Sequence, residues 1–174
     1  LRPDSGDYVW HYQTTPGETW DFTSTQHIML VDLEWQGKLR KLLLQAPKNG
    51  FFYVLDRETG KLLGADAYVK VTWASHVDIE TGRPVETPNA RYQLAPQAVQ
   101  PGPFGGHNWH PMAFNPQTGL VYVPTQELPF LYKDDKQYAR SGTGFNTGIE
   151  FHAGELPSDT AADSSVVKSL VGTL

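Results

Sequence analysis

The sequence predicts an all-β protein built from short strands joined by tight turns. Two observations support this fold class. The 174 residues include five Trp, eight Tyr and eight Phe together with 16 Gly and 13 Pro, and no stretch shows a long helical periodicity. A five-residue turn recurs between apolar runs. This combination is typical of β-propellers and related antiparallel folds.

The recurring turn has the pattern Asp or Asn, two variable residues, Thr and Gly. It occurs at 56–60, at 78–82 and, with Asn in the first position, at 115–119, and a degenerate copy lies at 2–6. The first side chain can accept hydrogen bonds from backbone amides two residues on, and Gly can take the positive φ that closes a hairpin. The turns are either an internal repeat or separate hairpins of a common type.

The first residues read as the end of a strand that runs into a turn, as if the chain began inside a larger fold. Trp10 follows four residues after Gly6, where a strand can pack it against a neighbouring sheet. Four apolar runs separated by short polar connections come next, and four is the number of strands in one propeller blade. The runs are 27–33, 39–45, 51–55 and 61–64.

The remaining chain divides into three parts. Residues 85–106 are rich in Pro, Gln and Gly, which predicts an irregular loop over a face of the sheet, and such loops commonly hold functional groups. Residues 111–114 and 120–125 are expected to form the hairpin that starts a second blade. The pattern within 128–174 predicts no element, and 159–170 is compatible with strand, helix or loop.

Charge and composition exclude two classes of function. The net charge is −5 and the 14 basic residues are scattered, so there is no concentrated basic face for nucleic acid. No apolar run approaches the roughly 20 residues that a membrane-spanning helix needs. The absence of Cys excludes a disulfide, a thiolate metal site and a c-type haem attachment motif within these residues.

Three strings resemble the pyrroloquinoline quinone (PQQ) dependent alcohol dehydrogenases, the quinoprotein and quinohaemoprotein family. They are WHYQTTPGETWDF, QAPKNGFFYVLDRETGKL and HNWHPMAFNPQTGLVYVP, at 10–22, 45–62 and 107–124. Long unusual strings are more specific than a short motif. The resemblance implies an eight-bladed β-propeller of four-stranded blades. Residues 1–174 would supply about two to three blades of one PQQ-binding domain, and a Trp after each turn would dock one blade on the next.

The resemblance also implies a function. The complete protein would oxidise alcohols to aldehydes or ketones in the periplasm, with PQQ and calcium as cofactors, a c-type cytochrome as electron acceptor and a haem c domain as a possible addition. In that family the calcium ligands and the catalytic Asp come from earlier chain, so no catalytic or metal-binding residue is expected here. An isolated arc of blades would expose strand edges, so it should be inactive without the remaining blades or self-association.

Lys48 is the first candidate for cofactor binding. It lies in a Lys-Asn-Gly turn between two apolar runs, and the resemblance implies that it hydrogen-bonds the ortho-quinone oxygens. A fixed cation there would stabilise the negative charge that reduction places on a quinone oxygen. The alternative is a solvated hairpin lysine, which is the usual role of a Lys before Asn-Gly.

Asn108 and Trp109 are the second candidates. The Gly105-Gly106 pair before them lets the backbone approach a ligand closely, and the resemblance implies that both side chains line the oxygens and carboxylates of the cofactor. The alternative is a turn Asn beside a core Trp. The flanking His-x-x-His spacing is compatible with a metal site, but ordinary hydrogen-bonded histidines are favoured because no acidic ligand motif is near.

Two further alternatives concern Asp21 and the class of protein. Asp21 is compatible with a catalytic acid beside an aromatic platform, but we expect a loop-ordering acceptor. The chain as a whole is also compatible with a non-enzymatic propeller scaffold of the periplasm. A third reading is a module that binds sugars or small carboxylates on Trp20, Trp73 or Trp109.

Overall fold

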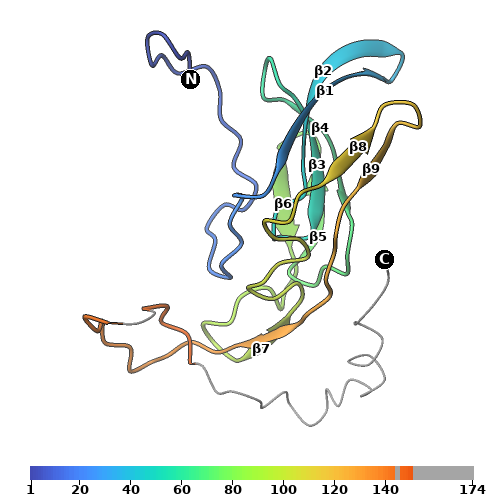
Figure 1. The fold of residues 1–174 in the computed structure, drawn as a ribbon. Coiled ribbons are helices and arrows are strands. Elements are labelled where there is room, and N and C mark those ends of the chain that lie inside the picture. The colour runs from blue at the N-terminus through green and yellow to red at the C-terminus, as the bar shows by residue number, and fades with distance from the viewer. Residues whose placement is uncertain (144–145, 151–174) are drawn as a thin grey trace.

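A computed structural model describes residues 1–143 and 146–150, and every regular element in them is a β-strand (Figure 1). The strands are β1 (Ile28–Trp35), β2 (Lys38–Gln45), β3 (Phe51–Asp56), β4 (Leu62–Ala67), β5 (Ala74–Asp78), β6 (Arg83–Glu86), β7 (Gln97–Val99), β8 (Ala113–Asn115), β9 (Leu120–Tyr122) and β10 (Phe130–Tyr132). None of these residues forms a helix of the length and hydrophobicity that crossing a membrane requires. The expectation for 159–170 lies outside the described residues.

Strands β1 to β4 form the four-stranded antiparallel sheet that the apolar runs predict, in the order β1-β2-β3-β4. The long β1–β2 hairpin pairs Ile28 with Gln45 at one end and Trp35 with Lys38 at the other. Each strand joins the next through a short turn, so the sheet is a meander with the arrangement of one propeller blade. Figure 1 shows its marked twist, which is the ordinary right-handed twist of antiparallel sheets.

The blade has a hydrophobic cluster on each face, because successive side chains of a strand point to opposite sides of the sheet. On β3, Phe51 and Tyr53 belong to an aromatic cluster that includes the fully buried Trp20 and Trp73. Val54 lies in the other cluster. That second cluster contains Met29, Leu42, Leu44, Ala46 and Met112, with Phe114 and Val121 of the β8–β9 hairpin packed against it. The blade is therefore covered on both faces, as in a propeller.

Three two-stranded sheets complete the described chain. The β5–β6 and β8–β9 hairpins flank the turns 78–82 and 115–119, and the second of them confirms the hairpin that the sequence predicts. Strand β7 pairs with β10, with Val99 opposite Phe130. The expectation of a wholly irregular 85–106 is therefore wrong, because a distant partner creates a strand there. The strand expected within 1–6 is also absent, and these residues form a turn.

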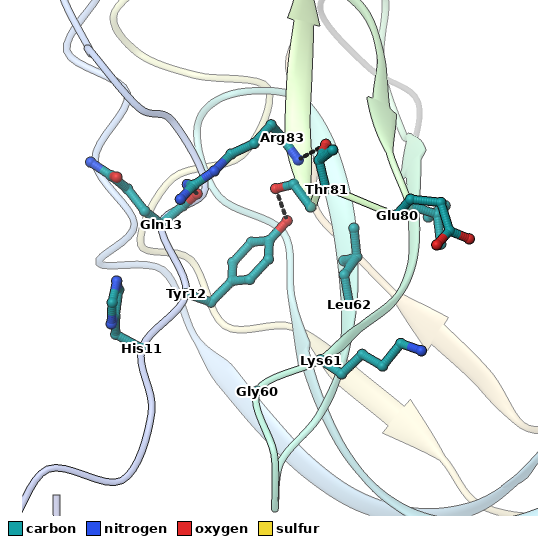
Figure 2. A pocket seen from close by; sticks show the side chains of 11 residues that line it. His11, Tyr12, Gln13, Gly60, Lys61, Leu62, Glu80, Thr81 and Arg83 are labelled. Carbon is teal, nitrogen blue, oxygen red and sulfur yellow. Dashed lines mark hydrogen bonds between the residues drawn. The ribbon is translucent and has the colours of Figure 1, made fainter.

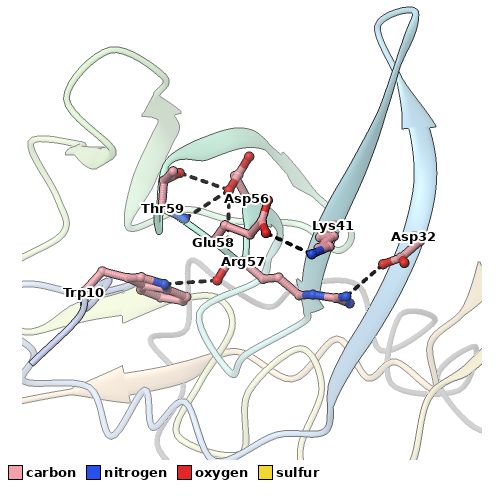
Figure 3. A network of polar contacts seen from close by, with 7 residues as sticks. All are labelled: Trp10, Asp32, Lys41, Asp56, Arg57, Glu58 and Thr59. Atoms are coloured by element: carbon pink, nitrogen blue, oxygen red, sulfur yellow. Dashed lines mark hydrogen bonds and ion pairs between the residues drawn. The ribbon is translucent and has the colours of Figure 1, made fainter. Parts of the chain in front are cut away.

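The repeated turns act as docking points for aromatic side chains of the N-terminal segment. The indole of Trp10 packs on Gly60 so closely that a Cβ there would lie 2.7 Å from the ring, and its Nε1 donates to the Arg57 carbonyl at 3.0 Å (Figure 3). Tyr12 covers Gly82 and its hydroxyl donates to the Gly82 carbonyl at 2.8 Å (Figure 2). Docking by Trp therefore occurs once, and a Tyr takes the same part at the next turn.

Candidate cofactor site

The Lys-Asn-Gly turn between β2 and β3 is held by a buried hydrogen-bond network around Asn49. The Asn49 Oδ1 accepts the Phe51 amide at 3.1 Å, its Nδ2 donates to the Tyr53 hydroxyl at 2.8 Å, and its carbonyl accepts the Trp73 Nε1–H at 2.8 Å. Burial raises the pKa of Tyr53 well above its ordinary value, which keeps the hydroxyl neutral as a donor to the Thr14 carbonyl at 3.1 Å. Satisfied buried networks of this kind fix a single conformation.

Lys48 is buried in this turn, with a side chain that is only 10% exposed. Its Nζ lies 3.0 Å from Asp21 Oδ2, and within the described residues it has no other hydrogen-bond partner. The interpretation as a solvated hairpin lysine is therefore wrong. An ammonium has three N–H donors, so two are not used by the described chain. A buried cation with unused donors fits an electron-rich oxygen ligand such as an ortho-quinone.

Asp21 reaches Lys48 because its backbone takes an unusual conformation. Its φ is 66°, a region that non-glycine residues enter rarely. The neighbours Trp20 and Phe22 are buried, whereas the Asp21 side chain is 62% exposed. The Glu18 carboxylate accepts both the Trp20 and the Phe22 amides. Glu18 therefore orders the loop, a role that the sequence analysis predicted for Asp21. The Asp21 side chain instead projects beside Lys48.

The glycine pair 105–106 packs directly on Lys48. A Cβ at Gly105 would lie 2.5 Å from Lys48 Cγ, and the φ of Gly105 is 79°, so this position needs glycine for two reasons. The Gly106 amide donates to the Lys48 carbonyl at 3.0 Å. The close backbone approach expected at the glycine pair is present, and in the described chain it is to the aliphatic part of the Lys48 side chain. The loop that carries Asn108 and Trp109 is thereby fastened to the Lys48 turn.

Asn108 and Trp109 lie at the surface of the described chain. The Asn108 side chain is half-buried, and its Nδ2 donates to the Phe104 carbonyl at 3.1 Å. Trp109 is 79% exposed and stacks on the His110 ring with centroids 5.9 Å apart. The alternative of a core tryptophan is wrong. Both ring nitrogens of His107 face backbone carbonyls. Within the described residues no group of three or more His, Asp or Glu side chains could hold a metal ion.

A pocket of about 350 Å³ lies elsewhere, between the N-terminal segment and the turns at 60 and 82 (Figure 2). Its polar lining includes His11, Lys61 and Arg83, and it contains none of the three residues predicted to bind the cofactor. Its hollow follows from the docking of Tyr12 between two turns. The buried Lys48 ammonium and the Asp21 carboxylate meet outside this pocket.

Comparison with known proteins identifies relatives of this chain. Residues 1–72 match the family described as the β-propeller domain of glucose, ethanol and alcohol dehydrogenases. The chain is 56% identical to quinohemoprotein alcohol dehydrogenase ADH IIB of Pseudomonas putida, over 87% of this chain and 22% of that protein. It is 46% identical to 1-butanol dehydrogenase (cytochrome c) of Thauera butanivorans, over 86% of this chain and 23% of that protein.

A solved structure, that of quinohemoprotein alcohol dehydrogenase from Comamonas testosteroni, superimposes with a TM-score of 0.82 at 50% identity. It covers 88% of this chain and 24% of that one. The chain thus spans about a quarter of the length of the relatives it matches. The strings, the docked turns and the shared fold lead to one conclusion: this chain belongs to the PQQ-dependent alcohol dehydrogenase family and corresponds to part of its β-propeller.

Proposed function

We propose that the protein containing this chain oxidises alcohols to aldehydes or ketones with PQQ as electron acceptor, and that Lys48, Asn108 and Trp109 bind the cofactor. One observation carries the proposal: a buried ammonium with unused donors is held between a fixed carboxylate and the glycine pair. Quinohemoprotein alcohol dehydrogenases are among the relatives, which supports the class of reaction and the cofactor.

Lys48 supplies a fixed positive charge in this proposal. PQQ, when bound, is the group that accepts the two electrons. A cation held at hydrogen-bond distance from an acceptor oxygen stabilises the negative charge that develops there, and it needs no reorganisation because Asn49 and Gly105 already fix its position. The Asn108 amide, with an oxygen that accepts no hydrogen bond from the described chain, adds a donor and an acceptor beside it.

Asp21 holds the Lys48 ammonium in this proposal. Its Oδ2 lies 3.0 Å from Lys48 Nζ, so the carboxylate offsets part of the cost of burying the cation and limits where the amine can point. The resemblance places the family's catalytic Asp in earlier chain, so Asp21 acts through the lysine and not as the base that accepts the hydroxyl proton.

The partners follow from the relatives. The name of the Thauera protein supports a c-type cytochrome as electron acceptor. We propose calcium as a further cofactor, with ligands outside the described residues, and the periplasm as the compartment. A sugar-binding module on Trp20 or Trp73 is disfavoured because both rings are completely buried. A bare scaffold gives no reason to bury the Lys48 ammonium, since desolvating a charge is costly.

Reconstitution tests the proposal. The complete protein is prepared without cofactor, PQQ and calcium are added, and reduction of an artificial electron acceptor is followed with a primary alcohol. Activity should appear only with PQQ, and Lys48→Met should lower kcat by about 100- to 1000-fold, the cost of removing one such charged group. Asp21→Asn keeps the lysine but removes its ion pair, so its effect on kcat should be smaller. Alcohol-independent or PQQ-independent reduction would overturn the proposed function.

A further inference from the structure

His107 lies between the two halves of the candidate site and is 1% exposed. Its Nδ1 is 2.7 Å from the Ala46 carbonyl oxygen, and its Nε2 is 2.8 Å from the His110 carbonyl oxygen. Ala46 lies two residues before Lys48, and His110 directly follows Trp109. One imidazole ring therefore links the backbone of the lysine turn to the backbone of the Asn108 loop.

The two contacts place the imidazole ring between two backbone segments. An imidazole tautomer with one N–H donates to one of the two carbonyl oxygens, and its other nitrogen lies against the second. In either tautomer the buried, planar ring fills the space between the Ala46 and His110 carbonyls and fixes the spacing of the two segments.

Backbone contacts fasten the same loop from other directions but do not replace the ring. The Gly106 amide donates to the Lys48 carbonyl, and the Gln126 amide donates to the Gly106 carbonyl at 2.9 Å. The Gln126 side chain donates to the Phe104 carbonyl at 2.8 Å. These bonds all lie on the glycine side of His107. No described hydrogen bond other than that of His107 Nε2 engages the carbonyl that follows Trp109.

We propose that His107 is a positioning residue that holds Asn108 and Trp109 at a fixed distance from Lys48. The proposal rests on the proposed function, because the groups it positions are those assigned to PQQ. It adds a residue with no direct role in binding: the ring acts through the backbone of its neighbours.

Three variants of the complete protein test the positioning role of His107. His107→Asn keeps a side-chain donor on the Nδ1 side, His107→Gln keeps one on the Nε2 side, and His107→Leu keeps neither. PQQ affinity is measured by titrating the cofactor-free protein and following quinone absorbance. The Leu variant should bind about tenfold to a hundredfold more weakly, the effect of one or two buried hydrogen bonds, and the Asn and Gln variants should recover part of the loss. His76→Gln, at an exposed histidine, is the matched control.

A second measurement needs no cofactor. In protein labelled with ¹⁵N in its histidine rings, the His107 ring N–H should exchange slowly with solvent because a buried carbonyl holds it, and the His107→Gln spectrum identifies its signal. Exchange as fast as that of the exposed His76 ring would show that His107 does not link the two segments. If the wild type binds PQQ and the variants that fold bind it equally well, the positioning role is wrong. If the wild type binds no PQQ, the proposed function fails while the exchange of the ring N–H still decides whether His107 links the two segments.

Discussion

The two sides of the candidate site differ in how firmly the described chain holds them. Lys48 is buried in a turn whose neighbour, Asn49, is completely inaccessible and makes hydrogen bonds with five other residues. Trp109 is 79% exposed, and among the described residues its only ring partner is His110. Folding of the blade therefore fixes the amine, whereas a short loop held by backbone bonds positions the indole. The first side should respond to mutation through stability and the second through ligand binding.

The largest contrast is expected between two tryptophans. Trp73→Ala removes a completely buried ring that packs on Phe51 and donates to the Asn49 carbonyl, so it should destabilise the protein by about 3–5 kcal/mol. Trp109→Ala should change the free energy of unfolding by no more than about 0.5 kcal/mol, yet weaken PQQ binding. Denaturant unfolding of both variants measures the first effect and cofactor titration the second. Equal destabilisation by the two variants would contradict the comparison.

A second contrast concerns two asparagines. Asn49→Ala leaves the Phe51 amide without its buried acceptor and the Tyr53 hydroxyl with only its bond to the Thr14 carbonyl, so we expect a loss of about 2–3 kcal/mol. Asn108→Ala removes one half-buried bond to Phe104 and should cost less than about 1 kcal/mol. Thermal unfolding of the two variants side by side checks the order. A larger cost for Asn108→Ala would show that the loop, and not the turn, is the stable half.

Substitutions at two glycines with similar φ angles distinguish the cost of backbone strain from the cost of a steric collision. Gly105 and Gly119 have φ values of 79° and 70°, but a Cβ at Gly105 collides with Lys48 whereas a Cβ at Gly119 meets nothing within 4 Å. Gly119→Ala should cost about 1 kcal/mol, from the backbone conformation alone. Gly105→Ala adds the collision, so it should cost about 1–3 kcal/mol more and displace the Lys48 amine. If Gly105→Ala and Gly119→Ala lose similar amounts of stability and of PQQ affinity, the Gly105 contact does not position the amine.

The smallest effect is at Tyr12, outside the site, where burial raises the pKa to about 12 although Arg83 opposes the rise. The folded protein therefore favours the neutral phenol. This contribution is fully present below the ordinary value near 10 and is lost as the pH rises from there through about 12. The phenolate absorbance difference between wild type and Tyr12→Phe should show one tyrosine titrating near pH 12. A midpoint near 10 would mean that Tyr12 does not dock on Gly82 in solution.

The blade could be predicted from the sequence because four continuous apolar runs alternate with polar turns. The β7–β10 pair could not, since two three-residue strands carry no pattern of their own and depend on pairing between Val99 and Phe130. The β5–β6 hairpin was seen only as a turn, because its second strand, Arg83–Glu86, contains two charged residues and a proline.

The site was predicted in part. Lys48, Asn108 and Trp109 were selected through the strings around them, and their role in cofactor binding stays a prediction. The close approach of Gly105 was expected from the glycine pair. The burial of Lys48 and its bond to Asp21 were not expected, because 27 residues separate the two and nothing in the sequence marks the positive φ of Asp21. The one available signal was an acidic residue between two aromatic residues, Trp20 and Phe22, that are both apolar enough to be buried.

The most direct measurement is a crystal structure of the complete protein with PQQ bound. Our account predicts that Lys48 Nζ and the Asn108 side-chain amide both lie about 3 Å from oxygens of one bound quinone, with Asp21 facing the same ring edge and His107 still bridging the Ala46 and His110 carbonyls. A quinone that contacts only one side of the site, or that binds away from the lysine turn, would contradict it.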